Sequence, residues 1–597
     1  MSNLCGAMLL ILGAWAALGV LCSGIGLLLR RAWGLKNPDL EACLQAFWLG
    51  WASVVLFLQI LHLFFPIGAS ALTVVFLAGV AGWCWHLHAL AGCWSRRRVG
   101  AWICIALWWC VVLVLANRAS GPPENGDTGI YYLNAIRWAS DYPVVPGLGN
   151  LHLFLALNSS HFLYASLVDV GPWEFRSQHV VNGLLLAVLL AQIAWSVAQL
   201  LTVPGAWRLR HLYFTLLLPI VLKWSDSRFW VSSPAPDLPI FILGILLVAS
   251  LLDMIESPDQ DAFASGFTLL GVGLLAALGV TIKLSFAVFA LTGVVLGVGI
   301  WVQRRGWGAQ SRKVLISVAA AMSLLIVPWM VRGIFLSGYP LFPSTLGAVP
   351  VEWRMPEEKT RAIREGITNW ARQPFKRPEE LLPGWAWLEP WSVQIGKKTF
   401  EVLVPLCLFG VSALFAFLLG KRGRRAAWLL LLVPLSSLVF WFLVAPDARF
   451  AGSAFWVLGV TAFLLALDDF KLLQRGALRG ALVAVALLLC LWPVKYFPWK
   501  KWNGPGSDAG FHPPPAPGCR LKAVPDSSAD GSLSVSPALE TRTGLKEFVT
   551  RSGLRIQVPV EGDQCWEAPL PCSPGCSPYL RLRSEGDLGQ GFKEDPP

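Results

Sequence analysis

The chain has 597 residues, of which 55% are hydrophobic and 14% are charged, and it contains 31 tryptophans. This composition is typical of a protein with many membrane-spanning helices. Membrane lipids are therefore expected to contact the protein. The formal net charge of +12 does not indicate a nucleic-acid partner, because the Lys and Arg residues are spread over short connections between apolar runs. We therefore expect an all-α polytopic membrane protein that binds no nucleic acid.

Apolar runs recur from the first residues to about residue 494, and most approach the length that spans a bilayer. No small-residue cleavage site follows the first run, so we predict that it is a retained membrane span and not a signal peptide. Residues 1–498 then form the membrane domain. We expect about 14 transmembrane helices, at residues 9–29, 47–65, 71–86, 102–116, 180–201, 212–222, 238–252, 263–280, 284–302, 314–327, 402–419, 426–444, 454–467 and 482–494.

The distribution of positive charge predicts which loops share a side of the membrane. The positive-inside rule makes the short basic connections cytoplasmic. Both termini then lie outside a plasma (bacterial inner) membrane, and so do the long polar loops at residues 117–179, 223–237 and 330–401. We therefore look for chemistry on the outer face. The basic connections are at residues 30–31, 96–98, 208–210, 304–313, 421–425 and 471–479.

The first long loop opens on the sequence Gly-Asp-Thr-Gly at residues 126–129, shortly after the expected membrane exit. A carboxylate at Asp127 can therefore lie near the headgroups and take a proton from a hydroxyl held there. An Asx-turn is the competing interpretation. Residues 151–167 are too polar to span and predict an amphipathic helix in the interface. Residues expected to support the site or bind substrate are Tyr131, Tyr132, Asn134, Arg137, Asn150 and His152.

Two charged residues lie at the ends of later spans. Asp237 begins a span, where the helix dipole favours a carboxylate, so capping competes with a site role. Lys283 lies between two apolar runs with almost no polar linker. Such a Lys either snorkels to the headgroups or binds an anion. Its position on the outer face, where Lys is disfavoured, indicates anion binding.

Two arginines also lie at the outer edge of the expected bundle. Arg332 precedes a loop that contains Tyr339, and Arg449 lies in a tight turn beside Asp447. A guanidinium matches phosphate bidentately. A local pair between Asp447 and Arg449 is the alternative. Together with Lys283, the arginines form a cationic set that we expect to hold a donor phosphate, with Tyr339 and Asp447 in supporting or substrate-binding roles.

This set of residues predicts glycosyl transfer from a lipid-linked donor. The cations would hold the phosphate and stabilise its developing charge as the glycosidic bond breaks. Asp127 would deprotonate the acceptor hydroxyl. The chain has no sequence resembling a nucleotide-binding loop, which favours a lipid donor over a nucleotide sugar. No metal site is expected and no cofactor is certain, and dependence on a divalent metal stays open.

The chain resembles the C-type integral-membrane glycosyltransferases, which carry an acidic residue in the first large outer loop and use polyprenyl-phosphate sugars. More narrowly, it is similar over most of its length, tail included, to a bacterial family of glycosyltransferase-like polytopic proteins. That family has a His beside the Tyr of the first motif, where this chain has Tyr132. The resemblance implies an inverting transfer from a polyprenyl-phosphate-sugar donor to a glycan or lipid-linked acceptor of the cell envelope, in polysaccharide biosynthesis. It is carried by residues 126–129, 144–150, 233–237, 283, 337–340 and 445–450.

The segment that follows the last expected span differs in composition from the membrane domain. Residues 499–543 are rich in Pro and Gly and predict a linker. Residues 544–597 predict a small extracytoplasmic α+β or β-rich domain with a strand at residues 554–560. Four cysteines on this oxidising side are possible disulfide partners, with three connectivities open and a zinc site as the less favoured alternative. They are Cys519, Cys565, Cys572 and Cys576.

Two other functions fit a polytopic protein with outer arginines. A polysaccharide polymerase or ligase would transfer whole glycans. A transporter would place ionisable residues within the spans near the midplane, whereas the charges named above lie at span ends. A catalytically silent scaffold is the remaining alternative.

Overall fold

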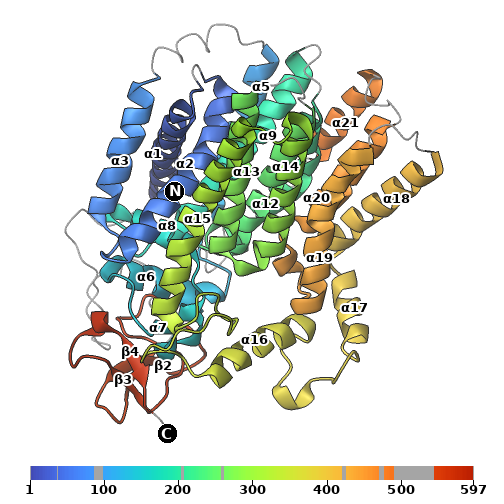
Figure 1. The fold of residues 1–597 in the computed structure, drawn as a ribbon. Coiled ribbons are helices and arrows are strands. Elements are labelled where there is room, and N and C mark those ends of the chain that lie inside the picture. The colour runs from blue at the N-terminus through green and yellow to red at the C-terminus, as the bar shows by residue number, and fades with distance from the viewer. Residues whose placement is uncertain are drawn as a thin grey trace.

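The computed structural model describes residues 2–35, 38–86, 99–203, 208–256, 261–419, 425–469, 476–489 and 544–595. Over these ranges the chain forms a bundle of long helices, with shorter helices and a small β region gathered at one end (Figure 1). The expected linker at residues 499–543 and Cys519 lie outside the described residues.

Ten helical stretches of the described residues are long and apolar enough to cross a membrane. The polytopic helical class is therefore confirmed, while the count of 14 spans and their orientation stay predictions. The main helices of these stretches are α1 (Ser2–Ala32), α2 (Leu40–His62), α5 (Val99–Ala119), α9 (Val181–Thr202), α12 (Asp237–Glu256), α13 (Ala262–Ile282), α14 (Ala287–Arg305), α15 (Ala309–Ser337), α18 (Val404–Leu419) and α19 (Leu432–Val444).

Four shorter helices coincide with the remaining apolar runs of the sequence. Two of them are apolar but below the length of a full span, α3 (Ala69–Cys84) and α20 (Ala454–Asp469). The others are α10 (Leu209–Ser225) and α21 (Gly476–Leu489). Short helices of this kind cross a membrane only where the bilayer thins or flanking side chains extend to the interface.

Small residues allow the first helices to pack closely. A Cβ added at Gly50 of α2 would lie 1.7 Å from the carbonyl oxygen of Cys22 in α1. Two helix backbones in lipid gain from such contact, because dispersion and packing drive their association where the hydrophobic effect is absent. Any side chain at this position would push the two helices apart.

The polar connections gather at the end of the bundle that lies lowest in Figure 1. This end carries α6 (Leu133–Asp141), α7 (Leu148–Leu151), α16 (Glu357–Arg372), α17 (Leu388–Gly396) and the C-terminal strands. The long loops that the sequence assigns to one side of the membrane therefore do share one end of the molecule. We call it the loop-rich end.

The expectation of an interfacial amphipathic helix at residues 151–167 is wrong. The chain there forms a short 3-10 turn, η2 (Leu153–Ala156), and then α8 (Ser160–Val168), whose residues are all buried. The polar side chains find partners inside the bundle instead of at the headgroups, since Ser160 Oγ lies 2.9 Å from Thr281 Oγ1. These partners are far away in sequence, so the local pattern could not reveal them.

The C-terminal segment folds into two antiparallel pairs, β1 (Leu545–Val549) with β2 (Arg555–Pro559) and β3 (Leu580–Leu582) with β4 (Phe592–Glu594). The strand expected from alternation is β2. The buried side chains of these strands pack against Trp138 and Leu151 of the first outer loop. The β region thus shares a core with the first outer loop.

Candidate functional site

Asp127 directly precedes a π-helical turn, η1 (Thr128–Tyr132), at the start of the first outer loop. The Tyr132 hydroxyl donates to Asp127 Oδ2 at 3.2 Å. Burial raises the pKa of Tyr132, and the neighbouring Tyr131 and Asp127 raise it further. Tyr132 is therefore a neutral phenol that holds the carboxylate in place, and Tyr131 packs edge-on against its ring.

Arg449 reaches Asp127 from the turn η9 (Ala448–Ala451). The Asp447 carboxylate accepts a hydrogen bond from the backbone N–H of Arg449 at 2.8 Å, so it caps the turn instead of pairing with the guanidinium. Arg449 Nη1 lies 3.1 Å from Asp127 Oδ2, and Nε lies 4.0 Å from Asp237 Oδ2. Burial lowers the pKa of Arg449, but these two carboxylates raise it more, so the guanidinium stays charged.

Lys283 joins the same cluster from the end of α13. Its Nζ lies 2.5 Å from Asp237 Oδ1 and 4.3 Å from the centre of the Phe450 ring. Asp237, at the first residue of α12, therefore has a charged partner as well as a helix terminus. Lys283 does not snorkel freely, since a carboxylate and an aromatic face both hold it.

Asp127, Asp237, Lys283 and Arg449 form what we call the charged quartet. Its two carboxylates and two cations have formal charges that cancel. The Asp127, Lys283 and Arg449 side chains are 26%, 25% and 21% exposed, whereas Asp237 is 2% exposed. The inner carboxylate thus fixes both cations, and the other three groups remain accessible to a ligand.

Aromatic rings enclose the quartet on one side. The Arg449 guanidinium lies 5.4 Å from the Trp370 ring of α16 and 4.9 Å from the Phe450 ring. No local sequence pattern marks Trp370 as part of this cluster. Beside Phe450 is a small pocket, lined among others by Ile240, Ser285, Phe286, Phe289 and Ser437.

A buried network fixes the two segments that carry the carboxylates. Thr128 Oγ1 and Ser233 Oγ are 2.8 Å apart, which ties the residue after Asp127 to the turn before Asp237. Asn182 of α9 is part of this network. Its side-chain oxygen accepts a hydrogen bond from His161 Nε2 at 2.9 Å, because the amide nitrogen of Asn182 faces backbone carbonyls instead. A polar residue inside an apolar span is a sequence signal that could have identified Asn182. Its amide donates to the carbonyls of Trp230, Ser233 and Ala235, at 3.0, 2.6 and 3.2 Å.

Arg332 lies in a different environment from the one expected. Its guanidinium is buried, with Nη1 donating to Asn158 Oδ1 at 2.5 Å and Nε donating to His62 Nδ1 at 3.3 Å. Neither partner belongs to the charged quartet. The structure therefore groups Lys283 with Arg449 but not with Arg332.

Most of the other predicted residues hold loops together. Tyr339 is buried and donates to the Met355 carbonyl at 3.0 Å. Asn150 donates to the Trp353 carbonyl at 2.8 Å. Burial lowers the pKa of His152 to about 4, so this side chain is neutral.

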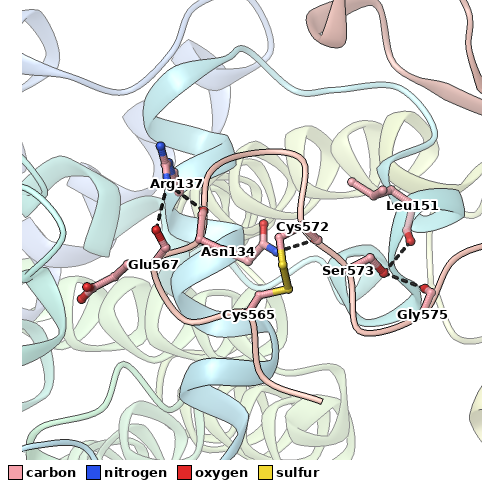
Figure 2. Close-up of a disulfide and its surroundings, with 9 residues drawn as sticks. Asn134, Arg137, Leu151, Cys565, Glu567, Cys572, Ser573 and Gly575 are labelled. Carbon is pink, nitrogen blue, oxygen red and sulfur yellow. Dashed lines mark hydrogen bonds between the residues drawn. A yellow bond between two sulfur atoms is a disulfide. The ribbon is translucent and has the colours of Figure 1, made fainter. Parts of the chain in front are cut away.

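The C-terminal segment contacts the first outer loop through the loop that its disulfide closes (Figure 2). Cys565 and Cys572 are bonded to each other, and Cys576 is a free thiol. Asn134 donates to the Cys572 carbonyl at 2.9 Å, and Arg137 donates to the Glu567 and Ala568 carbonyls at 3.2 and 2.8 Å. Asn134 and Arg137 thus bind this segment and not the charged quartet.

No metal centre is evident in the part of the chain that the structure describes, since no group of three or more His, Cys, Asp or Glu residues there is placed to hold an ion. The charged quartet pairs each carboxylate with a cation, which opposes metal binding by charge repulsion. The site is suited to an anionic ligand that reaches Arg449 and Lys283.

Fold and site together define a multi-span membrane protein with a charged cluster at the loop-rich end. Residues 8–456 match the model of a protein family described as a domain of unknown function (DUF8201), and the chain belongs to this family. The match contains all four residues of the charged quartet and ends before the C-terminal segment. No solved structure matches the chain significantly.

Proposed function

We propose that the chain is a membrane glycosyltransferase. It moves a sugar from a polyprenyl-phosphate donor to a lipid-linked glycan or another cell-envelope acceptor, on the outer face of the membrane. The observation that carries this proposal is the convergence of Asp127 with Arg449, 322 residues away in sequence, beside Lys283 at the loop-rich end. A base and two cations within one partly exposed cluster are the groups that this transfer needs.

Arg449 and Lys283 would bind the donor phosphate. Guanidinium and ammonium groups both form charge-assisted hydrogen bonds to phosphate oxygens. Asp237 keeps the two cations side by side, since it pairs with Lys283 and lies near Arg449. Arg332 has no part in this role, because its guanidinium is buried against Asn158 and His62.

Asp127 would act as the base once the donor is bound. The phosphate competes with Asp127 for Arg449, and the released carboxylate can then accept the proton of the acceptor hydroxyl. The acceptor oxygen forms a bond to the anomeric carbon, and the bond from that carbon to the phosphate oxygen breaks. Polyprenyl phosphate leaves with the electron pair, and Arg449 and Lys283 stabilise its charge. A single displacement of this kind inverts the anomeric configuration.

Transfer by the reconstituted full chain tests the proposal. Asp127→Asn removes the base and is expected to reduce turnover by about 10²- to 10⁴-fold. Glu174→Gln in the same loop is the matched control, since Glu174 is exposed and does not belong to the quartet. Turnover at the wild-type rate in Asp127→Asn would reject the proposed mechanism. No transfer from any polyprenyl-phosphate sugar by the wild-type chain would reject the function itself.

A further inference from the structure

The Cys565–Cys572 loop of the C-terminal segment lies directly against the turn that follows Asp127. The backbone N–H of Trp566 donates to the Gly129 carbonyl at 3.0 Å. The buried indole of Trp566 packs flat on Gly129, where an added Cβ would lie 2.5 Å from Trp566 Cε2. Only a residue without a side chain allows this contact.

The turn η1 is a single π-helical turn, a rare conformation that occurs frequently at functional sites. The Asp127 side chain does not cap it. A tie at Gly129, two residues from Asp127, therefore limits where the carboxylate can lie.

Two residues of α6 hold the same loop. Asn134 and Arg137 are three residues apart, so they share one face of the helix. Figure 2 shows both side chains directed at the loop, where Asn134 binds the carbonyl of Cys572 and Arg137 that of Glu567. The disulfide closes the loop between these contacts, and this presents Trp566 to η1.

The other end of the C-terminal segment contacts the second side of the site. Lys359 Nζ lies 2.5 Å from Glu594 Oε2, which links β4 to the first turns of α16. The same helix carries Trp370, which packs over the Arg449 guanidinium. The segment therefore connects the loop that carries Asp127 to the helix that covers Arg449.

We propose that the C-terminal segment is a positioning element of the charged quartet, with Trp566 as its positioning residue. It holds η1 so that Asp127 faces Arg449 in the donor-free state and the acceptor in the donor-bound state. The catalytic part of this inference rests on the proposed function, whereas the anchoring of η1 does not. The C-terminal segment lies outside the residues matched by the family model, whereas its contact residues Gly129, Asn134 and Arg137 lie within them.

Hydrogen exchange tests the anchoring without any substrate. Gly129→Ala places a methyl group against the indole and is expected to raise amide exchange in residues 126–137. Gly366→Ala in α16 is the matched control, because an added Cβ there meets nothing within 4 Å. The double variant Cys565→Ser/Cys572→Ser should raise the same exchange while both Trp566 and Gly129 are kept. Unchanged exchange in both tests would overturn the proposal.

Kinetics of the full chain test the positioning. Trp566→Ala is expected to lower kcat about 10- to 100-fold, because displacement of a catalytic group by about 1 Å has this effect. The donor KM should change less than about twofold, since the proposed phosphate-binding groups are Arg449 and Lys283. Trp566→Phe should restore most of the rate.

Two results separate this proposal from the proposed function. If the wild-type chain transfers no sugar, the function fails while the exchange data still decide the anchoring. If the wild type is active and Trp566→Ala raises exchange but keeps full kcat, the segment anchors η1 without positioning Asp127, and the inference fails alone.

Discussion

Arg449 and Arg332 both lie at the loop-rich end of the bundle, yet their surroundings differ in every respect that matters for ligand binding. Arg449 is partly exposed, has two carboxylates nearby and lies close to two aromatic rings. Arg332 is buried and binds a neutral amide and an imidazole. A guanidinium that can exchange its partner for a phosphate suits a site, whereas one enclosed by neutral groups ties helices together.

The comparison assumes that both arginines lie on the outer side of the membrane. Glu124→Cys in the first outer loop and Arg555→Cys in β2, whose parent side chains are 46% and 76% exposed, should react with an impermeant thiol reagent in intact cells. Gln310→Cys, in the first turn of α15, should react only after permeabilisation. These are all-or-none outcomes, the largest expected here. The reverse pattern would place the charged quartet in the cytoplasm.

Arg332→Ala should mainly reduce stability. The change leaves the Asn158 amide oxygen and the His62 ring buried without their partner, which costs about 2–4 kcal/mol. Thermal unfolding in detergent measures this loss. The molecules that remain folded should show the wild-type donor KM. A raised donor KM at wild-type stability would return Arg332 to the site.

Arg449→Ala should mainly reduce donor binding. Loss of one charge-assisted phosphate contact costs about 1.5–3 kcal/mol, or roughly 10- to 150-fold in affinity. Lys283→Ala should behave in the same way if its ammonium group also binds the phosphate. Donor titration of each reconstituted variant measures both effects. Equal donor affinity in wild type and Arg449→Ala would remove the phosphate from the quartet.

A smaller effect is expected from His152, in the first outer loop. Its pKa is lowered from 6.5 to about 4 by burial, so the folded chain binds fewer protons there than the unfolded chain does. This contribution to stability is complete above about pH 6.5 and is lost as the pH falls through about 4. It should amount to about 1–3 kcal/mol. Unfolding of wild type and His152→Gln at pH 7 and pH 5 measures it, and an equal pH dependence in the two proteins would exclude His152 as its source.

The sequence predicted the helical membrane class and the C-terminal strand correctly, because hydrophobic length and alternation are local signals. It also singled out Asp127, Asp237, Lys283 and Arg449, since charges at span ends are conspicuous. The prediction of an interfacial helix at residues 151–167 was wrong, because the polar side chains there bind distant partners such as Thr281.

The residues that hold the site in place could not be predicted from local sequence patterns either, because their partners are also distant. Trp566 and Gly129 are far apart in the sequence, and Trp370 has no motif that marks it. Asn182 could have been predicted from the sequence, because it is an amide in an apolar span. Arg332 and Arg449 follow similar sequence patterns, so tertiary contacts alone separate the two.

A structure of the full chain with a polyprenyl phosphate bound tests the central claim most directly. We predict phosphate oxygens within about 2.7–3.2 Å of Arg449 and Lys283, with Asp127 released from Arg449 and facing the sugar side of the phosphate. A phosphate bound by Arg332 and His62, or away from both arginines, would contradict the account.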